Sequence, residues 1–331
     1  MPCDNNILVK TLEFKEKDME DYALVMKDVC KDFKVLNRHE GLKGSIRDLF
    51  SRDYKTISAV KDVSLNVARG EIIGYLGPNG AGKSTTIKMM TGVLEPTSGE
   101  ITVNGKAPYK NRTENCENIG VVFGQRSQLW WSLPLIESFK LLRDLYMVPQ
   151  KEYEDMLELY RSLVDIEPIL NKPVRQMSLG QRTLSDILAA FLHNPAIVFL
   201  DEPTIGLDVS MKDKIRSLIL GLNKEKNTTV ILTTHDMGDV DALCKRIVII
   251  DHGQKIYDND IDHLKGYFGS YRTLHMRLED DTWEEMLIDE SKTDVMEVIM
   301  NKQKESRIKD IRLQEISTEE IIKKIYEGEA V

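Results

Sequence analysis

The sequence Gly77-Pro78-Asn79-Gly80-Ala81-Gly82-Lys83-Ser84 decides the fold of this chain. It fits the pattern G-x-x-x-x-G-K-[ST] and lies between a short apolar run at residues 71–76 and a helix-like segment that ends at Gly92. Glycines let successive amide groups point into one concavity, Lys83 can reach the β and γ phosphates of a nucleotide, and the Ser84 hydroxyl can bind Mg²⁺. A chance glycine-rich turn would not combine these residue types with these neighbours, so the stretch predicts a phosphate-binding loop.

A second element lies at residues 197–202, Ile-Val-Phe-Leu-Asp-Glu. Four apolar residues predict a buried strand, and ligands of α/β folds bind at the carboxyl ends of such strands. Asp201 is placed to support Mg²⁺, and Glu202 to accept a proton from, or orient, the water that attacks a γ phosphate. An apolar strand that ends in two acids is structural about as often as functional, so this interpretation depends on the loop upstream.

The hydrophobic pattern around these elements alternates between strand and helix, which predicts a parallel sheet with helices on its faces. Two strands precede the loop, at 23–36 and 58–70. Residues 133–170 carry apolar side chains at helical spacing and predict an all-helical insert. The elements predicted after the insert are strands at 197–200, 228–233 and 246–250 and helices at 211–224 and 237–243.

The last part of the chain has a different pattern. A strand at 271–278, a helix at 291–301, a strand at 308–313 and a final helix behind Ser317 predict a small βαβα domain without a catalytic motif.

Composition excludes several classes of protein. The chain has 331 residues, 41% of them hydrophobic, which is enough to bury a core and argues against wholesale disorder. No apolar run is long enough to span a membrane, and no secretory signal is recognisable, so we expect a cytoplasmic protein. The four cysteines form no metal-binding or disulfide pattern, and the net charge of −9 argues against a nucleic-acid partner.

Further motifs follow in a fixed order. Gln125 lies in Val-Val-Phe-Gly-Gln, residues 178–181 read Ser-Leu-Gly-Gln, Asp208 ends Gly-Leu-Asp, and His235 follows Thr-Val-Ile-Leu-Thr-Thr. Together with the loop and the acidic strand end, these motifs make the chain resemble the nucleotide-binding subunit of an ATP-binding cassette (ABC) transporter.

The resemblance implies a domain organisation. It implies an α/β fold of the P-loop NTPase class, an ABC cassette with a parallel-sheet core, an antiparallel β subdomain and a helical subdomain. We expect a charged tail at 1–21, the ATPase domain at 22–264 with its helical subdomain at about 130–180, and a small C-terminal α+β accessory domain at 265–331.

The resemblance also implies a site for ATP and Mg²⁺. Catalysis is expected from Glu202, His235 and Gln125, and metal binding from Ser84, Gln125 and Asp201. The nucleotide is expected to contact the residues of the loop and the one after it, namely Gly77, Pro78, Asn79, Gly80, Ala81, Gly82, Lys83, Ser84 and Thr85. Tyr54 is favoured over Phe33 as the aromatic that stacks on adenine.

A second cassette is expected to complete this site through its Ser178, Gly180, Gln181 and Asp208. Leu179 departs from the family, in which a glycine usually follows that serine. Because all motifs are present on one chain, we expect a homodimer.

The sequences of the motifs resemble those of the ATPase subunits of ABC-2 type exporters. This subgroup implies a separate integral membrane permease as partner and a peripheral location on the cytoplasmic face of the membrane. Trp130 and Trp131 lie where such subunits receive the permease, although one of them could equally be a core residue. Two alternatives remain open: an ABC ATPase of ribosomes or DNA repair, and a ligand-sensing regulatory ATPase.

Overall fold

The computed structural model describes residues 21–36, 54–124 and 127–327. The chain forms two compact units, which divide between Asp258 and Asn259, slightly before the expected boundary at Leu264. The expected tail lies outside the described residues except for Asp21. Among the helices that are described, none is long and apolar enough to cross a membrane.

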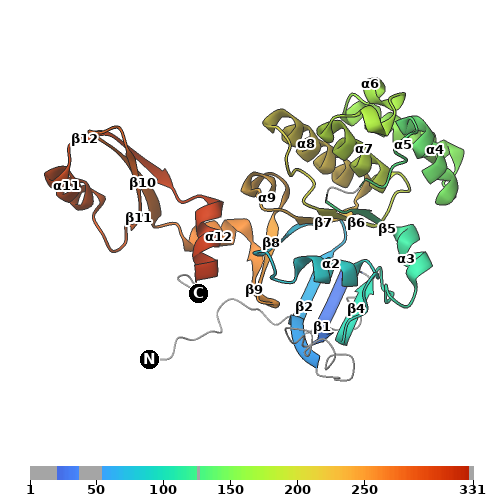
Figure 1. Ribbon diagram of the computed structural model, residues 1–331, viewed down its shortest axis with the longest axis horizontal. Helices are drawn as coiled ribbons and strands as arrows, with labels where there is room; N and C mark the ends of the chain where they lie inside the picture. Colours follow the sequence, from blue (N-terminus) through green and yellow to red (C-terminus); the bar gives the residue numbers. More distant parts are fainter. Residues whose placement is uncertain (1–20, 37–53, 125–126, 328–331) are drawn as a thin grey trace, which may run out of the picture. The chain divides into compact units, whose positions relative to one another are not determined.

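The first unit contains a six-stranded sheet in the order β5-β6-β7-β3-β8-β9 (Figure 1). Its strands are β3 (Ile72–Leu76), β5 (Ile119–Val122), β6 (Ile197–Asp201), β7 (Thr229–Thr233), β8 (Arg246–Asp251) and β9 (Gln254–Asp260). The pairings of β3 with β7 and β8, and of β6 with β5 and β7, are all parallel. Short, continuously apolar strands suit a parallel sheet because helices cover both of its faces, so the predicted parallel core is confirmed.

A second sheet is antiparallel and has the order β2-β1-β4. Its strands are β1 (Tyr22–Leu36), β2 (Tyr54–Ala68) and β4 (Ser98–Val103). The helix α2 (Lys83–Met90) lies between the two sheets (Figure 1). Met26 of β1, Ile87 of α2 and Ile73 of β3 belong to one buried cluster. Burial on both sides therefore fixes α2, and with it the loop that precedes it.

Helices cover the opposite face of the parallel sheet (Figure 1). These are α7 (Leu179–Phe191), α8 (Val209–Lys226) and α9 (Met237–Leu243), and α3 (Arg112–Asn118) precedes β5. The predicted helical insert consists of α4 (Leu135–Leu145), α5 (Gln150–Leu163), α6 (Glu167–Leu170) and a short 3-10 turn, η2 (Val174–Gln176). The buried Tyr160 of α5 donates a hydrogen bond to the Leu188 carbonyl of α7 at 2.6 Å, which anchors the insert.

The second unit contains a three-stranded antiparallel sheet in the order β11-β10-β12. Its elements are α10 (Ile261–Tyr267), β10 (Tyr271–Leu278), β11 (Trp283–Asp289), α11 (Val295–Glu305), β12 (Ile308–Glu315) and α12 (Thr318–Glu327). The expected βαβα order is therefore wrong by one strand, β11. In β11 only Ile288 is buried, so the strand lacks the clear apolar alternation that would reveal it in the sequence.

Candidate functional site

The glycine-rich loop turns sharply between β3 and α2. Gly82 has φ +104°, and a Cβ atom there would lie 2.5 Å from the Ala59 carbonyl oxygen. A Cβ atom at Gly77 would lie 2.5 Å from the Ile250 carbonyl oxygen. Only glycine fits both positions, and the loop leads directly into the N-terminus of α2, where an anion is stabilised.

Lys83 is the first residue of α2, and its side chain folds back over the loop. Its Nζ donates hydrogen bonds to the carbonyls of Gly77 and, at 3.1 Å, Pro78. Burial lowers the pKa of Lys83, while the carboxylates of Glu202 and Asp201 act in the opposite direction. The ammonium group therefore lies between the loop and the two acids, as a phosphate-binding lysine requires.

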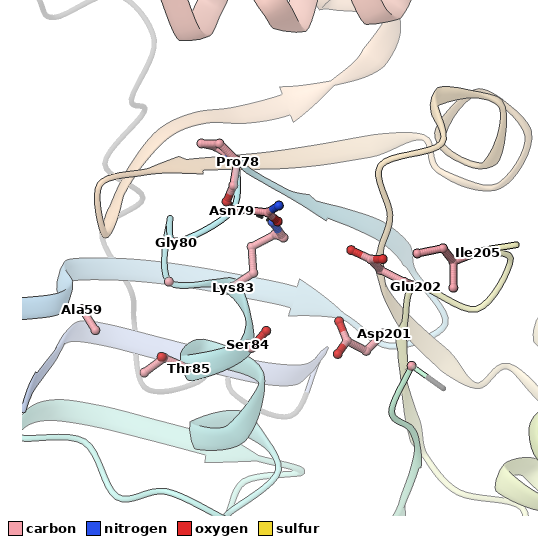
Figure 2. Close-up of a pocket in the computed structure, with 12 residues that line it drawn as sticks. Ala59, Pro78, Asn79, Gly80, Lys83, Ser84, Thr85, Asp201, Glu202 and Ile205 are labelled. Carbon is pink, nitrogen blue, oxygen red and sulfur yellow. Dashed lines mark hydrogen bonds between the residues drawn. The ribbon is translucent and has the colours of Figure 1, made fainter. Parts of the chain in front are cut away.

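These residues line a cavity of about 380 Å³ (Figure 2). Asp201 and Glu202 enter it from the side opposite Lys83 and Ser84 (Figure 2). The full lining consists of Ala59, Pro78, Asn79, Gly80, Gly82, Lys83, Ser84, Thr85, Gly124, Asp201, Glu202 and Ile205. The structure thus brings together, in one cavity, most of the loop and both acids of the strand end.

The end of β6 is held by its neighbour β7. The Thr233 hydroxyl donates to Asp201 Oδ1 at 2.5 Å, and the Glu202 amide donates to the Thr233 carbonyl at 2.9 Å. Glu202 has φ +51°, a left-handed conformation that is strained for a side-chain-bearing residue. A strained conformation of this kind persists only where surrounding contacts hold the backbone in it, and such residues are common at functional sites.

His235 contacts the second acid directly. Its Nε2 lies 3.0 Å from Glu202 Oε1, and about half of the imidazole surface is exposed. A carboxylate and an imidazole at hydrogen-bond distance, beside a phosphate-binding loop, can orient water and bind a γ phosphate.

The predicted signature residues lie apart from this cavity. Ser178 caps α7 and exchanges hydrogen bonds with Gln181 in a capping box, both at 3.2 Å. Gly180 packs on Met211, whose Cγ would be 2.6 Å from an added Cβ atom. Leu179 is exposed at the start of the helix. Ser178 therefore presents an exposed helix N-terminus, a suitable end for binding an anion.

Three further predicted residues have different outcomes. Asp208 is exposed and caps α8 by accepting from the Met211 amide at 3.0 Å. Neither Tyr54 nor Phe33 is part of the cavity lining, although Ala59 of the same strand as Tyr54 is. Adenine stacking by Tyr54 stays a prediction. Gln125 lies outside the described residues.

The donor set of the cavity is compatible with Mg²⁺. The described residues contain no group of three or more His, Cys, Asp or Glu side chains that could hold a metal by itself. Ser84 and Asp201 nevertheless offer oxygen ligands from two sides of the cavity. This fits Mg²⁺, which binds through one or two protein oxygens, substrate phosphates and water.

The structure also shows contacts beside the site that the sequence did not predict. Asp186 of α7 accepts from the Ser127 hydroxyl at 2.9 Å and the Gln128 amide at 3.1 Å, and so joins the segment after Gln125 to the signature helix. Burial raises the pKa of Asp186 to about 6. An acid in the middle of an apolar helix was the available signal, because a buried carboxylate needs partners.

The fold and the cavity define a P-loop cassette that binds and hydrolyses a nucleotide. A family model described as ABC transporter matches residues 60–205. The chain is 34% identical over 215 residues to the ABC transporter ATP-binding protein NatA of Bacillus subtilis (strain 168), a match that covers 65% of this chain and 87% of that protein. It is 36% identical over 229 residues to ABC transporter A family member 1 of Dictyostelium discoideum, covering 69% of this chain and 26% of that protein.

A solved structure agrees with these relatives. The dimeric ATP-binding cassette MJ0796, in a post-hydrolysis state bound to ADP and Pi, is similar with a TM-score of 0.58 and 28% identity, over 72% of this chain and 98% of that one. The chain belongs to the ABC transporter family as an ATP-binding subunit, and it is an ATPase. The predicted family, fold class and enzyme activity are thereby confirmed.

Proposed function

We propose that this subunit hydrolyses Mg·ATP with Glu202 as the group that activates water. The contact between Glu202 Oε1 and His235 Nε2, 3.0 Å long at the edge of the cavity, is the observation that carries this proposal. His235 orients the γ phosphate, and Lys83 with the loop amides binds the phosphates. Ser84, Asp201 and Gln125 would hold Mg²⁺, which neutralises phosphate charge when it is bound.

A second copy of the chain completes the site in this proposal. Ser178 is not among the residues that line the chain's own nucleotide cavity, yet the exposed N-terminus of α7 that it caps is suited to an anion. Gly180, Gln181 and the exposed Asp208 belong to the same contact. The similarity to a dimeric cassette supports pairing of two subunits across the nucleotide.

The proposed role is that of a motor for a separate integral membrane permease, on the cytoplasmic face of the membrane. Trp130 and Trp131 are 42% and 53% exposed, and Arg182 lies 4.7 Å from the Trp131 ring centre. Exposed aromatic and arginine side chains are frequent at protein interfaces, so we assign the permease contact to this surface. The resemblance of the motifs supports an ABC-2 type exporter.

Two variants test the hydrolytic assignment. Glu202→Gln should retain ATP binding, lose most turnover and accumulate as an ATP-bound dimer, because the amide cannot accept the water proton. Lys83→Ala should instead lose nucleotide affinity, as it removes the buried ammonium at the loop. Phosphate release, equilibrium binding of ATP and size-exclusion chromatography distinguish the two. Turnover at the wild-type rate in Glu202→Gln would disprove the role of Glu202.

A further inference from the structure

Asp239 of α9 is a fully buried carboxylate that does not line the nucleotide cavity. Its Oδ2 accepts hydrogen bonds from the Thr204 hydroxyl and, at 3.1 Å, from the Thr234 hydroxyl. Its Oδ1 accepts from Arg216 Nε at 2.7 Å. A buried carboxylate is stable only when donors replace water, and these three donors satisfy that requirement.

The donors come from three segments that the site uses. Thr204 follows Glu202 by two residues, and Thr234 directly precedes His235. Arg216 belongs to α8, the helix that Asp208 caps. One carboxylate therefore connects the loop of Glu202, the loop of His235 and the helix behind Asp208.

The neighbouring hydrogen bonds fix Asp239 as the acceptor and Thr234 as the donor. The Thr234 hydroxyl accepts from the Asp236 amide at 2.9 Å, so its proton is free to be donated to Asp239. Asp236 itself pairs with Lys212 and, at 3.4 Å, with Arg216. An uncharged replacement of Asp239 would leave Arg216 without its closest acid and weaken both threonine contacts.

We propose that Asp239 is a positioning residue for ATP hydrolysis, which fixes Glu202 relative to His235 by binding Thr204 and Thr234 through one carboxylate. The inference rests on the proposed roles of Glu202 and His235. Glu202 is in a strained left-handed conformation, which its surroundings must maintain. A displacement of about 1 Å of a catalytic group can cost roughly 100-fold in rate, so loosening either loop should lower turnover.

Substitutions at the carboxylate and at its donors test the proposal. Asp239→Asn should lower kcat about 10-fold to 100-fold while ATP affinity stays unchanged, because Asp239 does not line the nucleotide cavity. The double variant Thr204→Val, Thr234→Val keeps side-chain size and should act in the same way, whereas the serine variants retain the hydroxyls and should restore turnover.

Asp213→Asn is the matched control. Asp213 is exposed and pairs with Arg216 Nη1 at 3.2 Å, yet it accepts no hydrogen bond from Thr204 or Thr234. Turnover of Asp213→Asn should equal that of the wild type.

A double-variant cycle separates this proposal from the proposed function. If Asp239 acts through Glu202, Asp239→Asn will not reduce the residual turnover of Glu202→Gln further. Wild-type kcat in Asp239→Asn would overturn the inference. If Asp239→Asn fails to fold, the threonine variants decide, and equal turnover in the valine and serine double variants would overturn it. Wild-type turnover in Glu202→Gln would instead overturn the catalytic assignment on which the inference rests.

Discussion

The free energy of unfolding of the wild type should fall as the pH rises, because the buried carboxyl of Asp186 ionises at a cost. Replacing Asp186 by asparagine should remove this fall. Asp186 is only 6% exposed, and its burial raises the pKa from 3.8 to about 6. The pKa in the folded state is higher than in the unfolded state, so this group's contribution to stability is complete below about pH 4 and is lost as the pH rises through about 6. A rise of about 2 pKa units corresponds to about 3 kcal/mol in the free energy of unfolding.

The side chain in Asp186→Asn is neutral at every pH and can still accept from Ser127 and Gln128 through Oδ1. The unfolding free energy of the variant minus that of the wild type should therefore rise by about 2 kcal/mol between about pH 4.5 and about pH 7.5. Urea unfolding followed by tryptophan fluorescence measures this difference, since Trp131 lies near α7 through its contact with Arg182. Equal m-values are required for the comparison.

Two controls isolate the cause. Asp165→Asn makes the same chemical change at an exposed position and so controls for effects of the substitution that do not depend on burial. Ser127→Ala removes a hydrogen bond that lowers the pKa of Asp186, so the loss of stability should begin at the same pH, continue to higher pH and become larger. A constant difference for Asp186→Asn, or an equal rise for Asp165→Asn, would refute the reasoning.

Two other substitutions test the packing of the cassette. Tyr160→Phe should lower the free energy of unfolding by about 1–3 kcal/mol, because the buried Leu188 carbonyl loses its hydrogen bond, and urea titration would show a lower midpoint. Gly82→Ala should weaken ATP binding about tenfold in a fluorescent-nucleotide titration, since φ +104° and the nearby Ala59 carbonyl force the loop to move. Gly105→Ala also has positive φ, but no atom lies within 4 Å of its added Cβ, so it should bind ATP as the wild type does.

Much of the cassette could be predicted because its signals are local. The boundaries of α9 agree with the predicted helix at 237–243, and those of β7 differ from the prediction by one residue at most. Both segments carry their period within a few residues. The strand β11 could not be predicted in this way, because Trp283–Asp289 is mostly polar or exposed and becomes a strand through pairing with β10.

The residues of the candidate site also differ in how far the sequence could place them. The sequence could place Lys83, Asp201 and Glu202 in one cavity, because the motif sets the loop and the carboxyl ends of parallel strands meet at one edge. It could not show that Tyr54 lies outside the lining of this cavity, because pairing between the distant strands β1 and β2 decides where that side chain lies.

The sequence by itself determined a phosphate-binding loop on a parallel α/β core, because glycine spacing and apolar runs act over short stretches of chain. Only the tertiary structure decided which partners its buried carboxylates meet. Asp239 meets Thr204 across 35 residues, and Asp186 meets Ser127 across 59. Such contacts arise when distant segments are buried together and a carboxylate must find donors there, and no local pattern in the sequence specifies which donors it finds.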